Sequence, residues 1–404
     1  MKILVVVSEF PKITETFAYR NVVEYEHLGH DARIFHIKPF RDGEIVHDFM
    51  TGLVDRAFTY GYGSSKALGA LIMEAVTGPR RLGRLLTKIA REHRSEPKRG
   101  LAVLLFLPKA LALGRWCSRE GVDHIHGEFA GHPATAAMIA AEVAGIPFSF
   151  SAHANDIVVS QALLVEKAQK AAFVRSISRY NISFLNELRG FPADKLRLVR
   201  CGVTRSLLEK DGPPPSINGP LRILYVGSLI KKKGVNYLID ALAALPAELN
   251  WTARIIGGGD LADGLSAQVH ALGLEDRIQF EGPQPAEAVA QAFENTHVAV
   301  VPSIVGSQGR IEGIPVVVME ALAHGIPVIA SALSGIPELV EDGVTGYLTQ
   351  PEDSKAISEA IQKIAADWNG AATIAARGRD RVASEYVVED NARKLAALME
   401  ETVK

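Results

Sequence analysis

The chain has 404 residues, which is too long for one ordinary core and predicts two domains of roughly 200 residues each. Hydrophobic residues make up 48% of the sequence and charged residues 22%, as in a globular enzyme. The formal net charge of −2 gives no global field toward nucleic acid, so we expect no nucleic-acid partner. Cys117 and Cys201 lie far apart without a paired or zinc-binding spacing, which predicts buried thiols in a cytoplasmic protein.

The first half alternates strand-like and helical segments. It begins with the apolar run Ile3–Val7, which is too short for a signal sequence and predicts a buried parallel strand. The longest other apolar stretch, Leu101–Leu113, is interrupted by Pro108 and Lys109, so we expect no segment that spans a bilayer. The remaining predicted elements of this half are strands at Ala32–Ile37, His124–His126, Phe148–Ser151, Phe173–Ser176 and Leu196–Val199, and a helix at Ala134–Ala144.

Residues 79–99 form a strongly basic segment with apolar residues at helical spacing. Its eight cations, against Glu92 and Glu96, are Arg80, Arg81, Arg84, Lys88, Arg91, Arg94, Lys98 and Arg99. The apolar positions are Leu82, Leu85, Leu86 and Ile89. Two interpretations stay open: an amphipathic helix that lies in an anionic membrane surface, or the solvated basic face of a helix packed on the core.

A proline-rich segment separates the two halves. Residues 211–220 (DGPPPSINGP) contain four prolines and two glycines, and proline fixes φ and donates no hydrogen bond. We therefore predict a first domain at 1–205, a linker at 206–220 and a second domain at 221–383. A terminal helix at Ser384–Glu400, within residues 384–404, is expected to pack back on the first domain.

The second half repeats the alternation of strands and helices, which predicts doubly wound α/β layers in both domains. The predicted strands lie at 221–228, 252–259, 278–282, 298–303, Pro327–Ser331 and Gly346–Thr349. The predicted helices lie at Val235–Leu245, Leu261–Leu272 and Pro285–Asn295.

The stretch RIEGIPVVVMEALAHGIPVIA (310–330) carries two glutamates, Glu312 and Glu320, seven residues apart. If the first ends a loop and the second lies two turns into a helix, both carboxylates can face one site and accept sugar hydroxyls. Backbone N–H groups at the helix start would suit a diphosphate. An ordinary amphipathic helix with two surface glutamates explains the spacing equally well. The residues that would form the helix start are Gly313, Ile314, Pro315 and Val316.

This stretch resembles the E-x7-E signature of glycosyltransferase family 4, retaining enzymes with the two-domain GT-B fold. The resemblance implies two Rossmann-like domains facing a central cleft, with Glu312 on the donor sugar and Glu320 on the ribose. The segment YVGSLIKKKGVNYLIDAL is similar to the family's strand, loop and helix that reach the donor diphosphate, and its Lys233 matches the family's lysine.

Most family members carry an arginine directly after the glycine of that strand. This chain has Ser228 after Gly227, which puts half of the usual cationic clamp in doubt. Lys232 or Lys231 could compensate, and either could equally be a solvated surface lysine.

A glycine cluster at 257–259 follows a predicted strand, but Leu261 and Ala262 leave the dinucleotide pattern G-x-G-x-x-G incomplete. Gly258 is therefore interpreted as a position that lets the backbone pass close to a nucleotide. The resemblance implies that backbone groups around Phe280–Pro283, including Pro283, hold the base.

Three segments of the first half, SEFPKITETF, HIHGEFAGHPATAA and FSAHANDI, resemble bacterial polysaccharide-assembly members of the colanic-acid and exopolysaccharide type. The resemblance places His153 near the donor sugar. Candidates for the acceptor are Glu15, His126 and Asp156; a core histidine and a helix N-cap are the alternatives for His126 and Asp156. Because we find no carboxylate or cysteine at ligand spacing near the histidines, we expect no metal site.

The resemblance implies transfer of a hexosyl group from a nucleoside-diphosphate sugar, with UDP slightly preferred over GDP. The acceptor would be a hydroxyl of a lipid-linked glycan in cell-surface polysaccharide synthesis, at the cytoplasmic face of the inner membrane. No cofactor or metal is expected, since Lys233 and a helix start would stabilise the departing diphosphate. A sugar-nucleotide epimerase of the same fold and a non-catalytic sugar-nucleotide binder stay open as alternatives.

Overall fold

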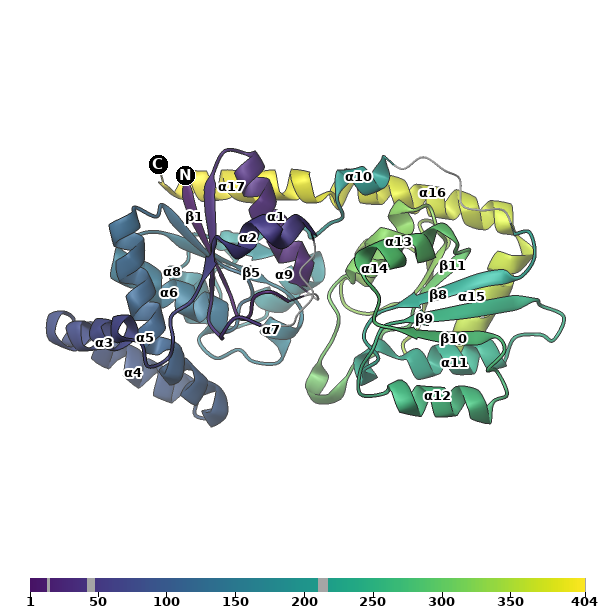
Figure 1. The fold of residues 1–404 in the computed structure, drawn as a ribbon, viewed down its shortest axis with the longest axis horizontal. Helices are drawn as coiled ribbons and strands as arrows, with labels where there is room; N and C mark the ends of the chain where they lie inside the picture. Colours follow the sequence, from purple (N-terminus) through teal and green to yellow (C-terminus); the bar gives the residue numbers. More distant parts are fainter. Residues whose placement is uncertain (13–14, 42–47, 210–216, 404) are drawn as a thin grey trace. The chain divides into compact units, whose positions relative to one another are not determined.

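The computed structural model describes residues 1–404 except 13–14, 42–47, 210–216 and 404 (Figure 1). The chain divides into two compact units: Met1–Val199 with Val388–Lys404, and Arg200–Val387. These limits differ from the boundaries at 205 and 383 expected from the sequence. Part of the expected linker forms a short helix, α10 (Arg205–Leu208), and residues 210–216 of that linker lie outside the described part of the chain.

The first unit is built on a seven-stranded sheet in the order β3-β2-β1-β4-β5-β6-β7, and all its pairs are parallel. Its strands are β1 (Lys2–Val7), β2 (Asp31–His36), β3 (Ala57–Phe58), β4 (His124–Gly127), β5 (Phe148–Ala152), β6 (Val174–Ser176) and β7 (Leu196–Leu198). The chain winds outward from β1 to β3 and resumes at β4 on the other side of β1. The carboxyl ends of β1 and β4 therefore form the switch point where open α/β sheets bind ligands.

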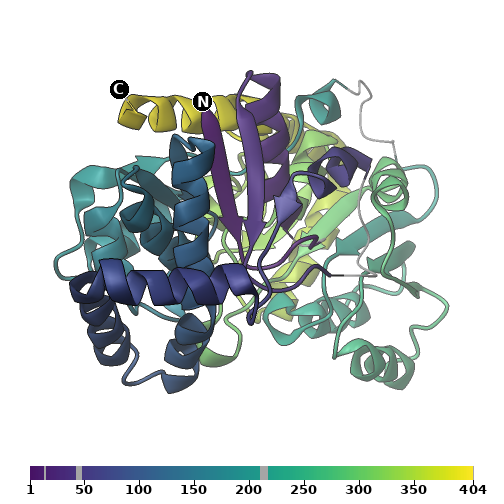
Figure 2. The same ribbon diagram turned by 60° about the vertical axis from the view of Figure 1, so that its left-hand side comes forward.

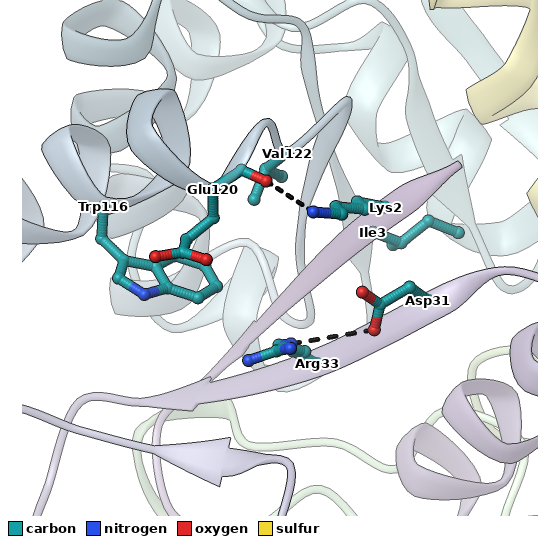
Figure 3. Close-up of a pocket in the computed structure, with 7 residues that line it drawn as sticks. All are labelled: Lys2, Ile3, Asp31, Arg33, Trp116, Glu120 and Val122. Atoms are coloured by element: carbon teal, nitrogen blue, oxygen red, sulfur yellow. Dashed lines mark hydrogen bonds and ion pairs between the residues drawn. The ribbon is translucent and has the colours of Figure 1, made fainter.

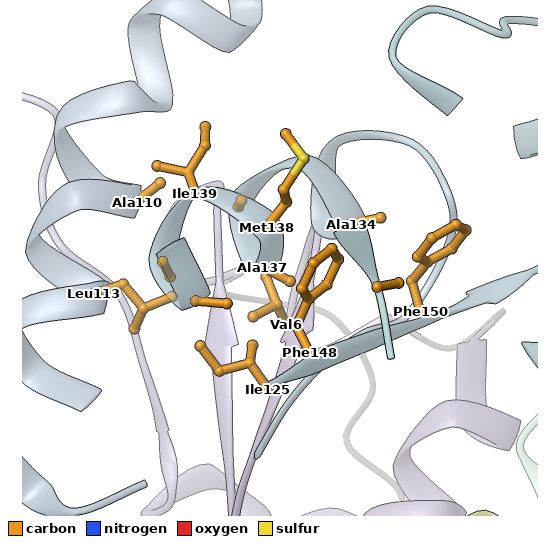
Figure 4. Close-up of a cluster of buried hydrophobic side chains, with 14 of the residues drawn as sticks. Val6, Ala110, Leu113, Ile125, Ala134, Ala137, Met138, Ile139, Phe148 and Phe150 are labelled. Carbon is orange, nitrogen blue, oxygen red and sulfur yellow. The ribbon is translucent and has the colours of Figure 1, made fainter. Parts of the chain in front are cut away.

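Helices cover both faces of this sheet. On one face, strand residues such as Val6 and Phe150 pack against α6 and α5, through residues such as Met138 and Leu113 (Figure 4). On the other face, α17 packs on α1 and buries Leu395. The helices of this unit are α1 (Thr16–His27), α2 (Thr51–Val54), α3 (Ser65–Thr77), α4 (Pro79–Glu92), α5 (Pro97–Glu120), α6 (His132–Ala144), α7 (Asn155–Val158), α8 (Leu164–Lys170), α9 (Arg179–Asn186) and α17 (Val388–Val403).

Helix α5 corrects one expectation from the sequence. Pro108 and Lys109 do not interrupt the apolar stretch, because the helix runs through both. Lys109 is buried, and its Nζ donates to the carbonyl of Ile37 at 2.6 Å and lies over the ring of Tyr62. By length and composition α5 could cross a membrane, but 61% of its apolar window is buried inside the unit, as in the core helix of a globular domain.

Helix α4 contains most of the basic segment 79–99, and three of its four large apolar side chains face the protein. Ile89 is fully buried, and Leu82 and Leu85 pack against the same core cluster. Of the four apolar residues considered for membrane insertion, only Leu86 is exposed. The second interpretation, a basic face on a core-packed helix, therefore describes α4.

The second unit holds a six-stranded sheet in the order β10-β9-β8-β11-β12-β13, also parallel throughout. Its strands are β8 (Leu221–Val226), β9 (Trp251–Ile256), β10 (Ile278–Gly282), β11 (Val298–Val301), β12 (Val328–Ser331) and β13 (Tyr347–Thr349). Its longer helices are α11 (Val235–Ala243), α12 (Ala262–Ala271), α13 (Ala286–Glu294), α14 (Val316–Ala323), α15 (Ser354–Ala366) and α16 (Trp368–Glu385). The switch point lies between β8 and β11. The two sheets confirm the predicted α/β class with doubly wound layers.

The C-terminal region differs from its expected form. The terminal helix begins at Val388 rather than near Ser384, because α16 occupies the chain up to Glu385. Between the two helices Val387 forms a parallel β-bridge with Val203, and Val203 N donates to the carbonyl of Tyr386 at 2.9 Å. Cys117 and Cys201 are free and buried, as predicted.

Candidate functional site

Two lysines and a glutamate meet at the carboxyl edge of the second sheet. Lys232 and Lys233 lie in a short 3-10 turn, η4 (Lys231–Lys233), between β8 and α11. Glu312 lies in the loop that leads into α14. Lys233 Nζ is 2.8 Å from Glu312 Oε2, and Lys232 Nζ pairs with Oε1. The predicted Lys233 and Glu312 are therefore in direct contact, and Lys232 joins them as a third member.

The charge balance of this cluster favours an anionic ligand. Burial raises the pKa of Glu312, but Lys233 and Lys232 outweigh it, so the pKa of this carboxyl lies below its ordinary value. Glu312 is ionised at neutral pH and neutralises only one of the two ammonium groups. The remaining positive charge suits a phosphate oxygen.

Glycine makes the turn that carries the lysines possible. Gly234 ends the turn with φ 64°, and a Cβ at this position would overlap the carbonyl oxygen of Pro302, just beyond β11. Ile304 N also donates to the carbonyl of Lys232 at 2.9 Å. The turn is thereby fastened across the switch point between β8 and β11, which fixes the direction of both lysines.

The glycine loops after β8 and β9 pass very close to one another. Gly257 has φ 141°, and a Cβ there would overlap the carbonyl oxygen of Gly227. A Cβ on Gly258 would lie 3.0 Å from Pro283 Cγ, so two of the predicted donor-binding residues are neighbours. Bare backbone at this edge leaves room for a flat ligand such as a nucleotide base.

Ser228 contributes its backbone to the loop after β8, since its carbonyl accepts a hydrogen bond from the buried Tyr225 hydroxyl at 3.0 Å. Among the lysines that could replace the absent arginine, Lys231 is exposed, whereas Lys232 is largely buried and paired with Glu312. The structure thus favours Lys232 over Lys231 as the second cation.

Helix α14 begins at Val316, and Pro315 is its N-cap with φ −62°. Proline therefore stands one position before the helix, rather than inside its first turn. Gly313 and Ile314 lead into this cap, and Glu320 lies half-buried in the second turn. The helix start follows Glu312 closely in sequence. The free N–H groups of its first turn form the positive end of the helix dipole.

A second polar cluster lies at the carboxyl edge of the first sheet, and sequence reasoning overlooked its central residue, Glu128. This carboxylate is buried just after β4. It accepts a hydrogen bond from His153 Nε2 at 2.8 Å, and it lies 3.4 Å from His126 Nε2 and 3.6 Å from Arg175 Nη1. Burial raises the pKa of Glu128, but hydrogen bonds from His126 and His153 and the charge of Arg175 hold it well below its ordinary value.

His126 and His124 point to the same side of β4, as their alternation predicts. Ser149 Oγ lies 2.8 Å from a ring nitrogen of each, and Ser151 Oγ lies 2.8 Å from His126 Nε2. His126 is thus a fully buried, hydrogen-bonded histidine, in agreement with the alternative kept open for it. Burial lowers its pKa, so it is neutral at pH 7.

Asp156 holds the backbone around His153. Its Oδ2 accepts from Ala130 N at 2.6 Å and from His153 N at 3.2 Å, so it orients the peptide and not the ring. The N-cap of α7 is Ala154, so the N-cap alternative for Asp156 is wrong. Glu15 is buried and bonded to Lys12 Nζ at 2.6 Å, and burial raises its pKa above the ordinary value.

In the part of the chain that the structure describes, no group of three histidine, cysteine, aspartate or glutamate side chains could hold a metal ion. Glu128 corrects the statement that no carboxylate accompanies the histidines. Its position two residues after His126 in HIHGEF was the available signal.

A pocket in the first unit lies away from both clusters (Figure 3). It is lined by Lys2, Asp31, Arg33 and Trp116, with Lys2 Nζ donating to the carbonyl of Glu120 at 2.7 Å. Lys2 and Asp31 begin β1 and β2, so this pocket is at the amino edge of the sheet. Open parallel sheets bind ligands at the opposite edge, and we assign the pocket no role.

Comparison with known proteins agrees with this geometry. Residues 209–381 match the family model described as Glycosyl transferases group 1. WcaL of Salmonella typhimurium, named for a role in colanic acid biosynthesis, is 33% identical over 214 residues, 52% of each chain. The GDP-mannose-dependent alpha-(1-6)-phosphatidylinositol monomannoside mannosyltransferase of Mycolicibacterium smegmatis is 28% identical over 253 residues, 60% of this chain and 65% of that protein.

Among solved structures, HepE of Anabaena in complex with UDP superimposes with a TM-score of 0.73 at 20% identity, covering 99% of this chain and 100% of that one. The sequence match spans about half the length of WcaL. The family match and WcaL confirm the predicted resemblance to glycosyltransferases, and the superposition on HepE confirms the predicted fold.

Proposed function

We propose that this protein is a retaining glycosyltransferase that moves a hexosyl group from a nucleoside-diphosphate sugar to a glycan hydroxyl. The observation that carries the proposal is the contact of Lys232 and Lys233 with the buried Glu312 at the switch point of the second sheet. Two cations, one carboxylate and a helix start are the groups that a diphosphate sugar needs. The family match over residues 209–381 supports the same function.

The reaction develops negative charge on the departing diphosphate. Lys233 and Lys232 would take up this charge, together with N–H groups at the start of α14, without a metal ion or cofactor. Glu312 would exchange one lysine contact for hydroxyls of the donor sugar. Glu320, two turns into α14, would bind the ribose. In a retaining, front-face reaction, the leaving phosphate helps to deprotonate the acceptor hydroxyl.

We propose His153 as a sugar-contacting residue, and the hydrogen bond from its Nε2 to Glu128 fixes the ring. Glu15 is a further candidate for acceptor binding because it is buried at the same edge and electrostatically coupled to His153. Asp156 would act by holding the backbone of His153, and His126 would act through its contact with Glu128.

The names of similar proteins guide our proposal for the nucleotide of the donor and for the class of acceptor. The UDP complex of HepE supports UDP, whereas the mycobacterial relative is named for GDP-mannose and for a phosphatidylinositol mannoside acceptor. We propose UDP as the nucleotide and a lipid-linked glycan as the acceptor, in cell-surface polysaccharide synthesis at the cytoplasmic face of the inner membrane. The colanic acid name of WcaL supports this pathway class.

A thermal-shift panel of UDP, GDP and their sugar conjugates tests the donor site. A ligand that binds only the folded state raises the melting temperature as ln(1 + [L]/Kd) increases. We expect a shift with uridine nucleotides that Lys233→Ala abolishes and Lys231→Ala preserves, because Lys231 is exposed and does not contact Glu312 in the described structure. No shift with any nucleotide would contradict the proposal.

A turnover assay separates the transferase from its alternatives. With an acceptor present, nucleoside diphosphate should be released and the glycosidic bond should keep the anomeric configuration of the donor. Conversion of the donor sugar into its epimer without acceptor would identify an epimerase. Tight binding without either reaction, across a range of acceptors, would identify a sugar-nucleotide binder.

A further inference from the structure

Helix α3 has an inverted distribution of apolar residues. The side that faces the protein carries Ala67, Ala70 and Glu74, all buried. The outer side carries the large aliphatic residues, including Ile72 at 66% and Val76 at 75% exposure. The large exposed apolar side chains on this helix are Leu68, Ile72, Met73 and Val76, at the spacing of one helical face.

This orientation is fixed by an ion cluster under the helix. The Glu74 carboxylate is fully buried and accepts from Arg81 Nε at 2.6 Å and Arg81 Nη2 at 2.7 Å. Arg115 of α5 lies 3.3 Å from the same carboxylate. Rotation of α3 to bury its aliphatic face would carry Glu74 away from Arg81 and Arg115 and break these ion pairs, which is unfavourable.

A row of large aliphatic side chains held outward marks a surface that another body covers. In Figure 2, this side of the first unit faces forward and α3 lies outside α5. The beginning of α5 adds three more exposed leucines, Leu101, Leu104 and Leu105. Thus α3 and the start of α5 both present apolar side chains to the surroundings.

The charges in this region indicate what covers it. Between Ser65 and Leu105 the chain has nine lysines and arginines but three glutamates. Arg80 and Arg84 are exposed on α4, directly after α3, and the described structure records no ion pair for either. Apolar side chains flanked by unpaired cations are the pattern of a segment that inserts between anionic lipid headgroups.

We propose that α3 docks this protein on an anionic lipid bilayer, with Leu68, Ile72, Met73 and Val76 in the acyl region and Arg80 and Arg84 on the phosphates. The helix has 13 residues, about 20 Å in length, so it lies in the interface and does not span the bilayer. A second copy of the chain fits less well, because two-fold pairing would bring the same uncompensated cations together.

The surface differs from the one that the sequence indicated, because Leu82, Leu85 and Ile89 of α4 face the core, which leaves only Leu86 and the cations exposed. The inference does not depend on sugar transfer. It deepens the proposed lipid-linked acceptor, since docking by the first unit would hold the protein where such an acceptor resides.

Vesicle co-sedimentation of the full chain, without donor or acceptor, tests the proposal. We expect binding to phosphatidylcholine vesicles that contain phosphatidylglycerol, and much weaker binding to phosphatidylcholine alone. The variant Ile72→Ser/Val76→Ser should lower the partition coefficient at least about tenfold, because two aliphatic side chains no longer enter the lipid. The variant Arg80→Glu/Arg84→Glu should lower it by about tenfold or more on anionic vesicles and make the remaining binding less sensitive to salt.

Matched controls use exposed residues elsewhere. Leu272→Ser/Val403→Ser removes exposed aliphatic side chains and Arg377→Glu/Lys394→Glu reverses exposed charges, and both should bind vesicles like the unmodified chain. All variants should keep the melting temperature and any nucleotide-induced shift, because the altered side chains are exposed. If the unmodified chain shows no nucleotide-induced shift, the proposed donor site fails. The vesicle assay contains no nucleotide, so its result still tests the lipid proposal.

Three results would overturn the proposal. The first is unmodified protein that stays in the supernatant with anionic vesicles. The second is an Ile72→Ser/Val76→Ser variant that binds these vesicles undiminished. The third is a dimer of the unmodified chain in sedimentation velocity that these substitutions dissociate, in the absence of vesicle binding. This third result would assign the same face to a second copy of the chain.

Discussion

At the scale of single residues, the first unit concentrates buried charge around Glu128. Its carboxylate is 2% exposed and the neighbouring Arg175 is 1% exposed, so neither has water as an alternative partner. Arg175 also donates from Nε to the carbonyl of Val199 at 2.9 Å. The pair is therefore part of the fold of the sheet edge as well as the support for His153.

Glu128→Gln removes this negative charge while keeping the shape of the side chain. We expect the free energy of unfolding to fall by about 3 kcal/mol, because a buried arginine loses its counter-charge. The loss should be largest at neutral pH. Since the pKa of Glu128 is depressed in the folded state, its contribution is present above the unfolded pKa of about 4.3 and disappears as the pH falls toward the folded value.

Urea unfolding at several pH values measures this difference. Arg175→Met in the Glu128→Gln background should restore part of the stability, because no unpaired charge remains. If the double variant loses as much unfolding free energy as Glu128→Gln and Arg175→Met lose together as single variants, the two groups do not interact.

Lys167 provides a pH-dependent effect of the same sign in a higher pH range. Its Nζ is buried beneath α6, where it donates to the carbonyl of Ala130, and burial lowers the pKa of Lys167 to about 7. The unfolded chain, with a lysine pKa of about 10.4, binds more protons than the folded chain between these values. Stability should therefore rise with pH from about 7 to 10.4.

The comparison of the unmodified chain with Lys167→Met isolates this contribution. The stability difference between them should move in favour of the lysine form as the pH rises, with a slope of at most about 1.4 kcal/mol per pH unit. Chemical denaturation across that range measures it. A pH-independent difference would mean that the buried amine keeps an ordinary pKa.

At the scale of elements, the loops of the second sheet depend on glycine backbone. Gly257→Ala should destabilise the unit by about 2 kcal/mol or more, because its φ of 141° and its contact with the Gly227 carbonyl both exclude a side chain. Nucleotide binding should fall with it. Gly264→Ala is the matched control, since a Cβ there meets nothing within 4 Å and α12 gains a better helix former.

Thermal unfolding should show changes in stability of opposite sign for the two variants. Gly264→Ala should raise stability by up to about 1 kcal/mol. Equal and small effects for both variants would show that the loops after β8 and β9 can move apart.

The strands were predictable because fully buried parallel strands have continuous apolar sequences, as in Ile3–Val7. The edge strand β3, with two residues and neither of them buried, gives no such signal and was not predicted. The helical character of residues 79–99 was evident from their spacing. The direction of the apolar face was not, because α4 packs on residues distant in sequence, such as those of α5.

The two clusters show the same limit for functional residues. Lys233 and Glu312 were predicted because each belongs to a recognisable motif, and the structure puts them in contact. Glu128 was missed because two of its three partners lie at strands distant from it in sequence. His126 is only two residues away in sequence, but His153 and Arg175 approach Glu128 only after β4, β5 and β6 become neighbours in the sheet, an order that no local pattern specifies.

At the scale of the whole molecule, the first unit is discontinuous in sequence. Helix α17 follows the entire second unit in the chain, yet it packs on α1, where Leu395, Ala396 and Met399 are buried. His124 of β4 is also bonded to Thr402 of this helix, with Nδ1 and Oγ1 2.8 Å apart. The first unit is therefore complete only after residues from Val388 onward have been synthesised.

Leu395→Ala/Met399→Ala should destabilise the first unit selectively. Each truncation of a buried aliphatic side chain costs about 2–5 kcal/mol, so the pair can exceed the stability of a small domain. Hydrogen exchange followed by mass spectrometry distinguishes the units without any ligand. Peptides from β1, β4 and α1 should exchange faster, while peptides from β8, β9 and α11 should keep their protection. Val403→Ala, at an exposed position of the same helix, should change neither set. Faster exchange in both sets would mean that the two units unfold as one cooperative body, and the separate cores would then not be independent sources of stability.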